Sequence, residues 1–285
     1  MRLRFRHPSH GLLLAGLLLL SLNCVGRVHY SEVPNSHPQR LDAHPRTLSE
    51  SAFWEQVPRR PQETDERYAA RLAGLVSDRM VLIDPRFAKP TLCENWVLWL
   101  YAQYLGYYEW LDTHRAVRMG GGFCSQHAIV YNNILRYQGL ESRIVWLNGH
   151  VLNEVLVEGA WQVFDPDYDV AFGASLKELE ADPDRAYGAY RGAGLSEAEA
   201  RKFAEMFESE RDNWHFKTSQ HYASVAGYLV ERLSFLVIWI IPIAFLAAGW
   251  LAHSWDAVVR WSTETRSRTA LTGMALGPEA TPWPT

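Results

Sequence analysis

The chain has 285 residues, of which 48% are hydrophobic and 13% aromatic. A chain of this size can bury a sizeable core and still have apolar segments left for a membrane. Its formal charge of -4 and its scattered basic residues, without a run of five like charges, exclude the electrostatic pattern typical of nucleic-acid-binding proteins. We expect no nucleic-acid partner.

The first segment, residues 1–26, has the pattern of a secretory signal. Arg2, Arg4 and Arg6 precede an apolar stretch from Gly11 to Leu22, which matches the charged and hydrophobic regions of an export signal. The segment is expected to be either a cleaved signal peptide or a retained signal anchor. In both cases the following domain is exported.

Residues 27–60 are polar and rich in proline and histidine, which is typical of a linker or irregular arm. Apolar residues then recur at helical spacing from Asp65 to Met80. A second helix is predicted to begin at Thr91, where Glu94 completes a capping box, and to end before Gly106.

Cys124 follows a run of three glycines and Phe123, and it opens an apolar helical stretch that ends at Gly139. A cysteine at a helix N-terminus faces unsatisfied backbone N–H groups and the positive end of the helix dipole, which both favour thiolate. The pattern therefore predicts a nucleophile on a central, buried helix.

After this helix the apolar pattern changes to alternation, which predicts strands over Ser142–Leu147, Val151–Val157 and Ala160–Asp165. A two-residue turn at Glu158-Gly159 would pair Val157 with Ala160. His150 and Asp165 would then lie diagonally across from each other on one face. We expect this face to pack on the helix that begins at Cys124.

The partner of His150 stays open between two aspartates. Pro166 interrupts the ladder just beyond Asp165, and Asp167 would lie directly opposite His150 if pairing continued. A slip of one residue in the turn would move His150 and Asp165 to opposite faces.

Three sequence segments together resemble the core of the transglutaminase-like superfamily, over about residues 92 to 170. They are Gly122-Phe123-Cys124, His150-Val-Leu-Asn153-Glu154-Val and Gly159-Ala-Trp161-Gln-Val-Phe-Asp165-Pro166. The resemblance implies Cys124 as nucleophile, His150 as general base and acid, and Asp165 as the group that orients the imidazole. The fold it implies is α+β, a papain-like core with a central helix packed on an antiparallel sheet. His127 departs from the pattern, because the family more often has an aromatic or small residue there.

These residues have two other interpretations. Taken singly, a cysteine before an apolar helix is usually a core residue, and a glycine run is usually a loop. Cys124 and His127 also have the C-x-x-H spacing of zinc ligands, which His150 and Asp165 would complete. Only one cysteine is involved, so we expect His127 to be a packed or hydrogen-bonded histidine and expect no metal or cofactor.

Residues 171–232 are predicted to form a helical extension. Ser175 with Glu178, and Ser196 with Glu199, make capping boxes that begin two helices. The second helix is expected to run towards Trp214. These helices are expected to brace the core or to cover its cleft.

The stretch from Leu233 to Ala252 is nearly uninterrupted apolar sequence, long enough to span a bilayer as a helix that Pro242 kinks. Arginines follow it at Arg260, Arg266 and Arg268, which predicts a cytoplasmic tail over residues 253–285. The core, residues 61–170, would then lie on the extracytoplasmic side of the cell inner membrane.

These patterns predict cysteine-dependent acyl transfer on an amide or ester by a membrane-anchored enzyme, either a thiol protease or amidase or a transglutaminase-like acyltransferase. Hydrolysis is slightly favoured, because bacterial-type relatives in the superfamily include many hydrolases. The expected substrate is a peptide or protein in the cell envelope. The alternative is a non-catalytic, membrane-tethered binding or assembly module of the same fold. Trp96 or Trp110 could line the cleft or donate to an oxyanion.

Overall fold

The computed structural model describes residues 8–28, 32–42, 44–208 and 213–275. The chain divides into two compact units. One lies within residues 26–235 and contains the sheet; the other combines residues up to Val25 with those from Leu236 onward. Arg2, Arg4 and Arg6 lie outside the described residues.

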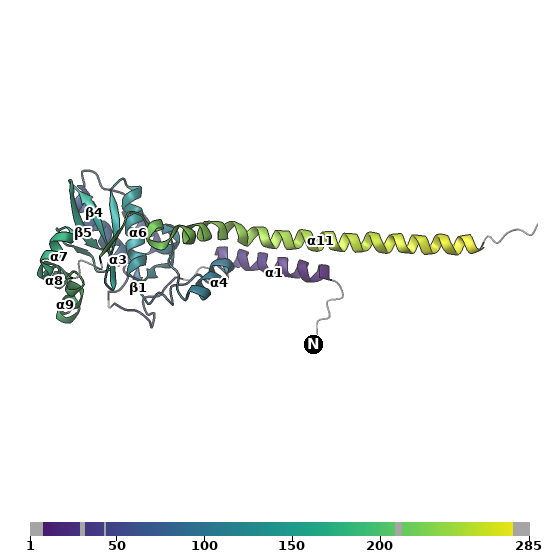
Figure 1. Ribbon diagram of the computed structural model, residues 1–285, viewed down its shortest axis with the longest axis horizontal. Helices are drawn as coiled ribbons and strands as arrows, with labels where there is room; N and C mark the ends of the chain where they lie inside the picture. The colour runs from purple at the N-terminus through teal and green to yellow at the C-terminus, as the bar shows by residue number, and fades with distance from the viewer. Residues whose placement is uncertain (1–7, 29–31, 43, 209–212, 276–285) are drawn as a thin grey trace, which may run out of the picture. The chain divides into compact units, whose positions relative to one another are not determined.

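The first unit is α+β and is built around a five-stranded antiparallel sheet of order β6-β5-β4-β3-β7 (Figure 1). Its strands are β3 Ser142–Leu147, β4 His150–Val157, β5 Ala160–Asp165, β6 Val170–Ala171 and β7 Trp214–Phe216. Val157 pairs with Ala160, which confirms the predicted register. Glu158 and Gly159 both have positive φ, +50° and +85°, as a tight hairpin turn with the twist of the sheet requires.

Helix α6, Cys124–Tyr137, is the central helix of this unit and is buried along most of its length. It packs on the sheet face that carries Ile144 and Val151, and Asn153 donates to the Ala128 carbonyl at 3.1 Å. On its other side lies α3, Asp65–Arg79, whose Ala69 carbonyl accepts a hydrogen bond from Tyr131.

The sheet face of His150 differs from the one predicted to meet α6. His150 and Asp165 have the parity of Leu152 and Val163, and these two residues pack in a core with the helices that follow the sheet. Both faces of β4 are apolar, so alternation alone could not tell which face meets which layer. Cys124 still lies close to His150, because Cys124 is the first residue of α6 and His150 is the first residue of β4.

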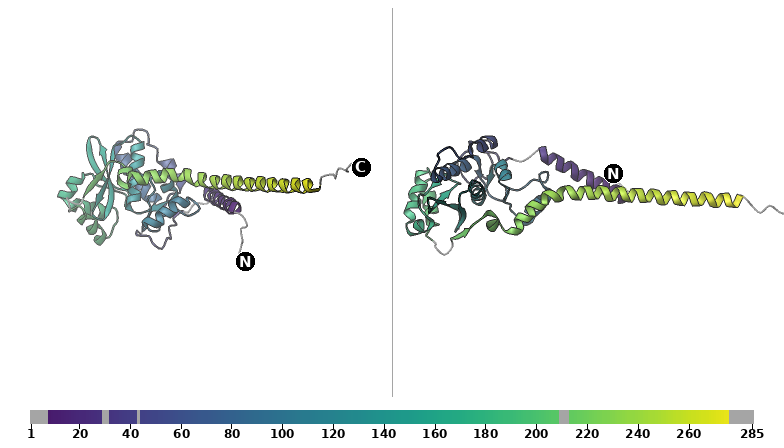
Figure 2. Two further views of the ribbon diagram at one scale, coloured as in Figure 1. Left: turned by 45° about the vertical axis from the view of Figure 1, so that its right-hand side comes forward. Right: turned by 90° about the horizontal axis from the view of Figure 1, so that it is seen from above.

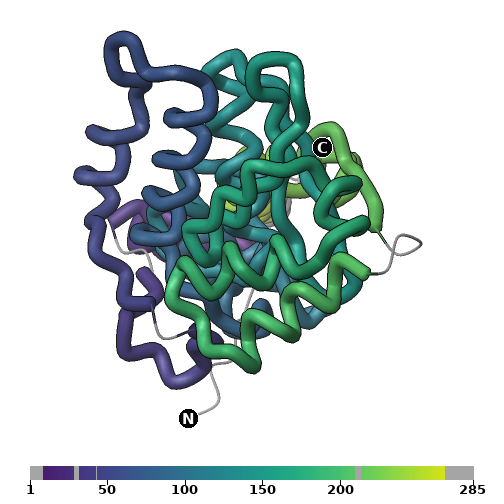
Figure 3. Tube along the Cα trace, turned by 90° about the vertical axis from the view of Figure 1, so that its left-hand side faces the viewer, coloured from purple at the N-terminus to yellow at the C-terminus, as the bar shows by residue number. Residues whose placement is uncertain are grey.

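The helices of the extension cover the second face of the sheet. They are α7 Leu176–Ala181, α8 Pro183–Gly192 and α9 Glu197–Glu205 (Figure 3). Both predicted capping boxes form, at Ser175 and at Ser196. The expected run of the last helix towards Trp214 is wrong, because α9 ends at Glu205 and Trp214 begins β7. That strand pairs with β3 and satisfies an otherwise open sheet edge.

A small parallel sheet, which the sequence did not predict, positions the start of α6. Strand β1, Val81–Leu82, pairs with β2, Gly121–Gly122, two residues before Cys124. A Cβ on Gly122 would lie 2.4 Å from Cβ of Gln126. Glycine here leaves room for the Gln126 amide, which accepts from the Trp110 N–H and donates to the Trp110 carbonyl.

The remaining helices are α2 Glu50–Gln56, α4 Trp96–Leu105, α5 Thr113–Met119 and α10 Ser219–Ala223. Helix α2 lies inside the segment predicted as a linker or irregular arm. The reciprocal bonds of Thr91 and Glu94 form, but α4 begins later, with Asn95 as its N-cap. The predicted start at Thr91 is therefore wrong, because the Thr91 box closes only a single turn.

Helix α11, Val225–Ala275, is continuous through Pro242 and extends well beyond the predicted span in both directions (Figure 2). Its first turns belong to the sheet-containing unit, where Ser234 accepts a hydrogen bond from Asn95 at 2.8 Å. Glu231 accepts hydrogen bonds from the Tyr108 hydroxyl and from the N–H groups of Leu111 and Asp112.

In the second unit, α1, Pro8–Val28, packs antiparallel on the later part of α11. A Cβ on Gly16 would lie 2.8 Å from the Pro242 carbonyl oxygen, and one on Gly249 would lie 2.8 Å from Leu13. Near the other end of α1, Asn23 donates to the Ile238 carbonyl. Both α1 and α11 are long and apolar enough to cross a membrane.

Candidate active site

Cys124 is the first residue of α6 and is buried, with 3% of its surface exposed. The short strand β2 ends two residues before Cys124. Phe123 is the N-cap of α6 and makes no side-chain capping hydrogen bond. The backbone N–H groups of Val151 and Ser125 point at the sulfur atom. The thiol therefore lies between the N-terminus of the central helix and the start of β4.

His150 is held by Asp165 at the end of the sheet. The Nε2 atom of His150 and Oδ2 of Asp165 are 2.7 Å apart. Asp165 is fully buried, and it also accepts from the Tyr190 hydroxyl at 2.8 Å and from the Asp167 N–H at 3.0 Å. Because Nε2 is engaged, Nδ1 is the ring nitrogen that remains for the thiol.

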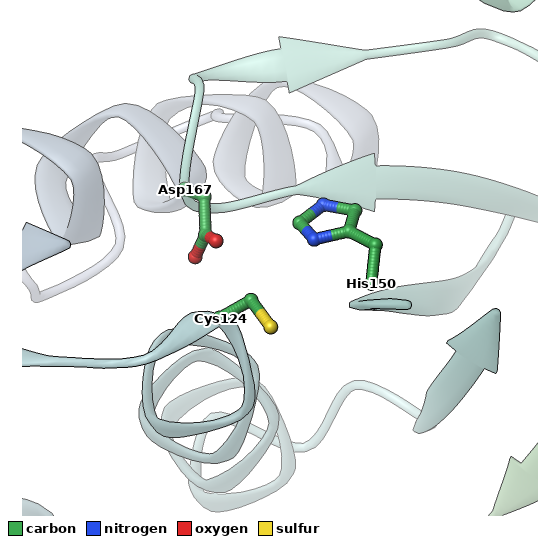
Figure 4. Close-up of side chains that lie close together, drawn as sticks. All are labelled: Cys124, His150 and Asp167. Atoms are coloured by element: carbon green, nitrogen blue, oxygen red, sulfur yellow. The ribbon is translucent and has the colours of Figure 1, made fainter. Parts of the chain in front are cut away.

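The sulfur of Cys124, a ring nitrogen of His150 and a carboxylate oxygen of Asp167 all lie within 4.8 Å of one another (Figure 4). Residues far apart in the sequence thus converge in one buried group. The two aspartates that the sequence could not separate have different positions: Asp165 binds the imidazole, and Asp167 faces the thiol. Both are near His150 because β5 ends at Asp165 and residues 166–169 form the turn to β6.

Asp167 is a buried carboxyl with unusual surroundings. Neither of its oxygens has a hydrogen-bond partner among the described residues, and Nδ1 of His127 lies 3.4 Å from Oδ1. Burial, together with the nearby charge of Asp165, raises the pKa of Asp167 well above its usual value. The Asp167 carboxyl therefore holds its proton more tightly than an ordinary aspartate does.

His127 is fully buried one turn into α6. Its Nδ1 lies 3.0 Å from the Phe123 carbonyl oxygen and its Nε2 lies 3.3 Å from the Met80 carbonyl oxygen. Burial lowers the pKa of His127, so its ring is neutral. These contacts make it a packed, hydrogen-bonded histidine.

The protonation of the thiol differs from the expectation based on the helix N-terminus. Burial, with a smaller contribution from Asp167, raises the pKa of the Cys124 thiol well above its usual value, although the Val151 and Ser125 N–H groups lower it. Desolvation of a thiolate outweighs the helix N-terminus here. The free protein therefore holds a thiol, whose proton must leave as it reacts.

His150 is suited to accept that proton. Burial disfavours a charged imidazole, but the charge of Asp165 and its hydrogen bond outweigh burial and raise the pKa of His150 above its usual value. An imidazole with raised proton affinity beside a buried thiol forms a proton-transfer pair.

The extension helices supply a second layer around this pair. The Phe203 ring of α9 lies 5.0 Å from the His150 ring, and the Tyr168 ring lies 6.1 Å from it. Tyr190 of α8 donates to Asp165. Sequence reasoning missed Tyr190, since no local pattern relates a residue on α8 to a strand end twenty-five positions earlier. It also missed Tyr168, which lies in the turn after β5.

The donors present could also hold a metal ion. Cys124, His150 and Asp167 offer three ligand atoms within 4.8 Å of one another, the number of protein ligands in many catalytic zinc sites. The C-x-x-H spacing suggested a different ligand set, in which His127 and Asp165 took the place of Asp167. His127 contacts backbone carbonyls, and Asp165 binds the far nitrogen of His150.

Of the tryptophans considered for the cleft, Trp110 is 2% exposed and stacks near Phe235 and Tyr108 in the core. It supports the site through its backbone, which Gln126 holds.

No protein-family model, curated protein or solved structure matches this chain.

Proposed function

We propose that this protein is a membrane-anchored enzyme that transfers acyl groups from an amide or ester through the thiol of Cys124. The observation that carries the proposal is the order sulfur, imidazole, carboxylate within one buried group, in which Asp165 binds one ring nitrogen and leaves the other for the thiol. A nucleophile, a base and a group that orients the base are the parts such chemistry needs.

In the proposed reaction, Sγ of Cys124 attacks the substrate carbonyl carbon while Nδ1 of His150 takes the thiol proton. Asp165 stabilises the imidazolium, and the Cys124 backbone N–H helps to bind the oxyanion. The imidazolium then gives its proton to the leaving amine or alcohol as the carbon–heteroatom bond breaks. Water or an amine attacks the resulting thioester, loses a proton to His150 and releases Cys124 as the thiol.

The proposed substrate is a peptide or protein of the cell envelope, reached from the extracytoplasmic side of the inner membrane. Support comes from the signal-like start of the chain and from the two apolar helices, α1 and α11. The resemblance to the transglutaminase-like superfamily, with a papain-like core, supports the reaction class and slightly favours hydrolysis.

The test is covalent labelling of the Cys124 thiol. The full-length protein in detergent is treated with a small thiol-directed electrophile at pH 7, and labelled peptides are identified by mass. We expect labelling of Cys124 that drops by about 100-fold or more in His150→Ala. Cys93→Ala is the matched control, because it removes a partly exposed thiol outside the group. Its Cys124 should be labelled as in the wild type.

The alternative is a binding or assembly module that has this fold without turnover. Burial of Cys124 and of His150, each 3% exposed, favours it, because a structural thiol is also buried and protonated. An unreactive Cys124 in the folded protein, with Cys93 still labelled, would decide for this module and against the enzyme.

A further inference from the structure

A cavity of about 430 Å³ lies directly beside the nucleophile. Phe123 and Ser125, the two chain neighbours of Cys124, both line it. The same cavity is bounded by the loop that follows α4 and by the first turns of α11. Neither Cys124 nor His150 belongs to its lining, so the cavity is a separate compartment next to the reacting atoms.

Aromatic side chains are the largest class in the walls of this cavity. Six rings line it, those of Tyr101, Tyr107, Tyr108, Phe123, Trp146 and Tyr222. The faces of such rings carry partial negative charge and attract cations. Tyr107 and Trp146 are each more than two-fifths exposed, so the cavity is open to an entering group.

Glu109 provides the acidic group of the cavity. Its Oε1 accepts a hydrogen bond from the Ser125 hydroxyl. Burial raises the pKa of Glu109 to about 7, and no nearby charge contributes. No lysine, arginine or histidine lines the cavity, and among the described residues none forms an ion pair with Glu109. Within the part of the chain that the structure describes, the Glu109 carboxyl thus has no counter-charge.

The other acid of the cavity has a structural task. Glu231 is buried and accepts hydrogen bonds from the Tyr108 hydroxyl and from the backbone of Leu111 and Asp112. These bonds tie α11 to the loop after α4. Glu109 is therefore the acid that can serve a ligand.

We propose that this cavity binds a primary ammonium group of a substrate, held by Glu109 and the surrounding rings, while the reacting carbonyl carbon is presented to Cys124. The inference rests on the proposed acyl transfer, because it assigns the substrate class of that site. A compact ammonium fits better than a guanidinium. Ser125 already occupies one oxygen of Glu109, and guanidinium recognition uses both carboxylate oxygens in parallel.

The ammonium can belong to either substrate of an acyl transfer. It is part of the acyl donor when the enzyme cleaves beside a residue with a free amine. It is the acyl acceptor when an amine resolves the thioester. The ammonium must then first give a proton to the Glu109 carboxylate, because only the neutral amine can attack the carbonyl carbon. Both share the same recognition chemistry, and the products distinguish them.

Binding is measured first, without chemistry. Cys124→Ala protein, full length in detergent, is titrated by calorimetry with 6-aminohexanamide and with hexanamide, which differ by one ammonium group. We expect the amine to bind at least about tenfold more tightly. Glu109→Gln in the same background should reduce the ratio of the two affinities to near one, and Glu66→Gln, an exposed acid of α3, should keep it. Equal affinities for both amides would overturn the inference, whatever the thiol does.

Turnover then separates the two sources. The probes are 4-methylumbelliferyl esters of 6-aminohexanoic and hexanoic acid, with the thermal unfolding of each variant checked in parallel. A donor site makes the amino ester the better substrate by about tenfold in kcat/KM. An acceptor site makes added butylamine, but not butanol, yield N-butylhexanamide. Glu109→Gln should erase whichever preference is seen.

The outcomes distinguish this inference from the proposed function. Binding of 6-aminohexanamide without turnover of either ester would support the cavity and count against the acyl transfer. Turnover with neither preference would keep the acyl transfer and remove the ammonium site.

Discussion

The carboxylate of Asp165 lies 2.7 Å from Nε2 of His150 at the open end of the β4–β5 hairpin. This pair sets the proton affinity of the imidazole. Asp165 and Asp167 raise the pKa of His150, and Lys202 lowers it. The sulfur of Cys124 lies within 4.8 Å of a ring nitrogen of His150. Tyr190 and the Asp167 N–H hold Asp165 in place.

Asp165→Asn should shift the acid limb of the pH profile. If the proposed reaction holds, activity in the wild type should be lost as pH falls through the raised pKa of His150, because a protonated imidazole cannot accept the thiol proton. Without the carboxylate the pKa of His150 falls, so the acid limb of the kcat/KM profile moves to lower pH. The highest kcat/KM drops by about 100-fold or more. The measurement is kcat/KM against pH for an activated ester.

Tyr190→Phe is the matched control for that variant. It removes one hydrogen bond from Asp165 and keeps the charge, so we expect a much smaller loss and a limb displaced only slightly. An acid limb at the same pH in wild type and Asp165→Asn would contradict the role given to this pair.

The second prediction concerns Asp167, whose raised pKa makes the folded state less stable at high pH. A carboxyl that holds its proton more tightly when folded contributes stability below its unfolded pKa, near 4. That contribution is lost as pH rises towards the folded value. We expect the difference in unfolding midpoint, wild type minus Asp167→Asn, to decrease from pH 5 to pH 8.

Differential scanning fluorimetry of both proteins across this range gives that difference directly, and titrations common to both proteins cancel. Asparagine keeps a hydrogen-bonding group of the same size beside Cys124, so esterase activity should change by only a few-fold. A midpoint difference that stays constant or rises with pH would show that Asp167 is ionised.

The third prediction concerns metals. The three donors Cys124, His150 and Asp167 lie close enough to bind zinc, and a bound ion would occupy the nucleophile and its base. We therefore expect micromolar zinc to inhibit ester hydrolysis and a chelator to reverse the inhibition. Magnesium, which prefers oxygen ligands, is the control and should have no effect. Loss of activity on chelation, restored by stoichiometric zinc, would instead identify a zinc enzyme.

The β4–β5 hairpin at the centre of the site could be predicted from the sequence, because the length of its turn fixes the strand pairing. Glu158 and Gly159 form the two-residue turn, the turn sets the pairing of Val157 with Ala160, and the pairing places His150 near Asp165. Helix α6 was equally accessible, since its apolar run has a clear start and stop. These features depend on neighbours within a few residues.

The missed features depend on tertiary packing. Both faces of β4 are apolar, so the alternating pattern could not say that α6 covers the face of Val151 and α8 and α9 that of Leu152. The protonation of Cys124 depends on burial, which competes with the local helix N-terminus. Glu109 lies in a loop without periodicity, and only the folded chain shows that it meets Ser125.

The last prediction concerns the N-terminal helix, for which the sequence allowed cleavage or retention. In the second unit, α1 packs on α11 at Gly16, and Asn23 donates to the Ile238 carbonyl. Inside a bilayer such close packing and such a bond favour association of two helices. We expect the intact mass of the membrane-extracted protein to include residues 8–28.

Gly16→Val tests the packing itself. A side chain there would overlap Leu246 and the Pro242 carbonyl, and overpacking costs about 1–3 kcal/mol. Gly11→Val in the same helix is the matched control, because a Cβ there meets nothing within 4 Å. The unfolding midpoint in detergent should therefore fall for Gly16→Val and stay near the wild-type value for Gly11→Val. Equal midpoints for the two variants, or a mature chain that lacks α1, would show that this segment serves as an export signal only.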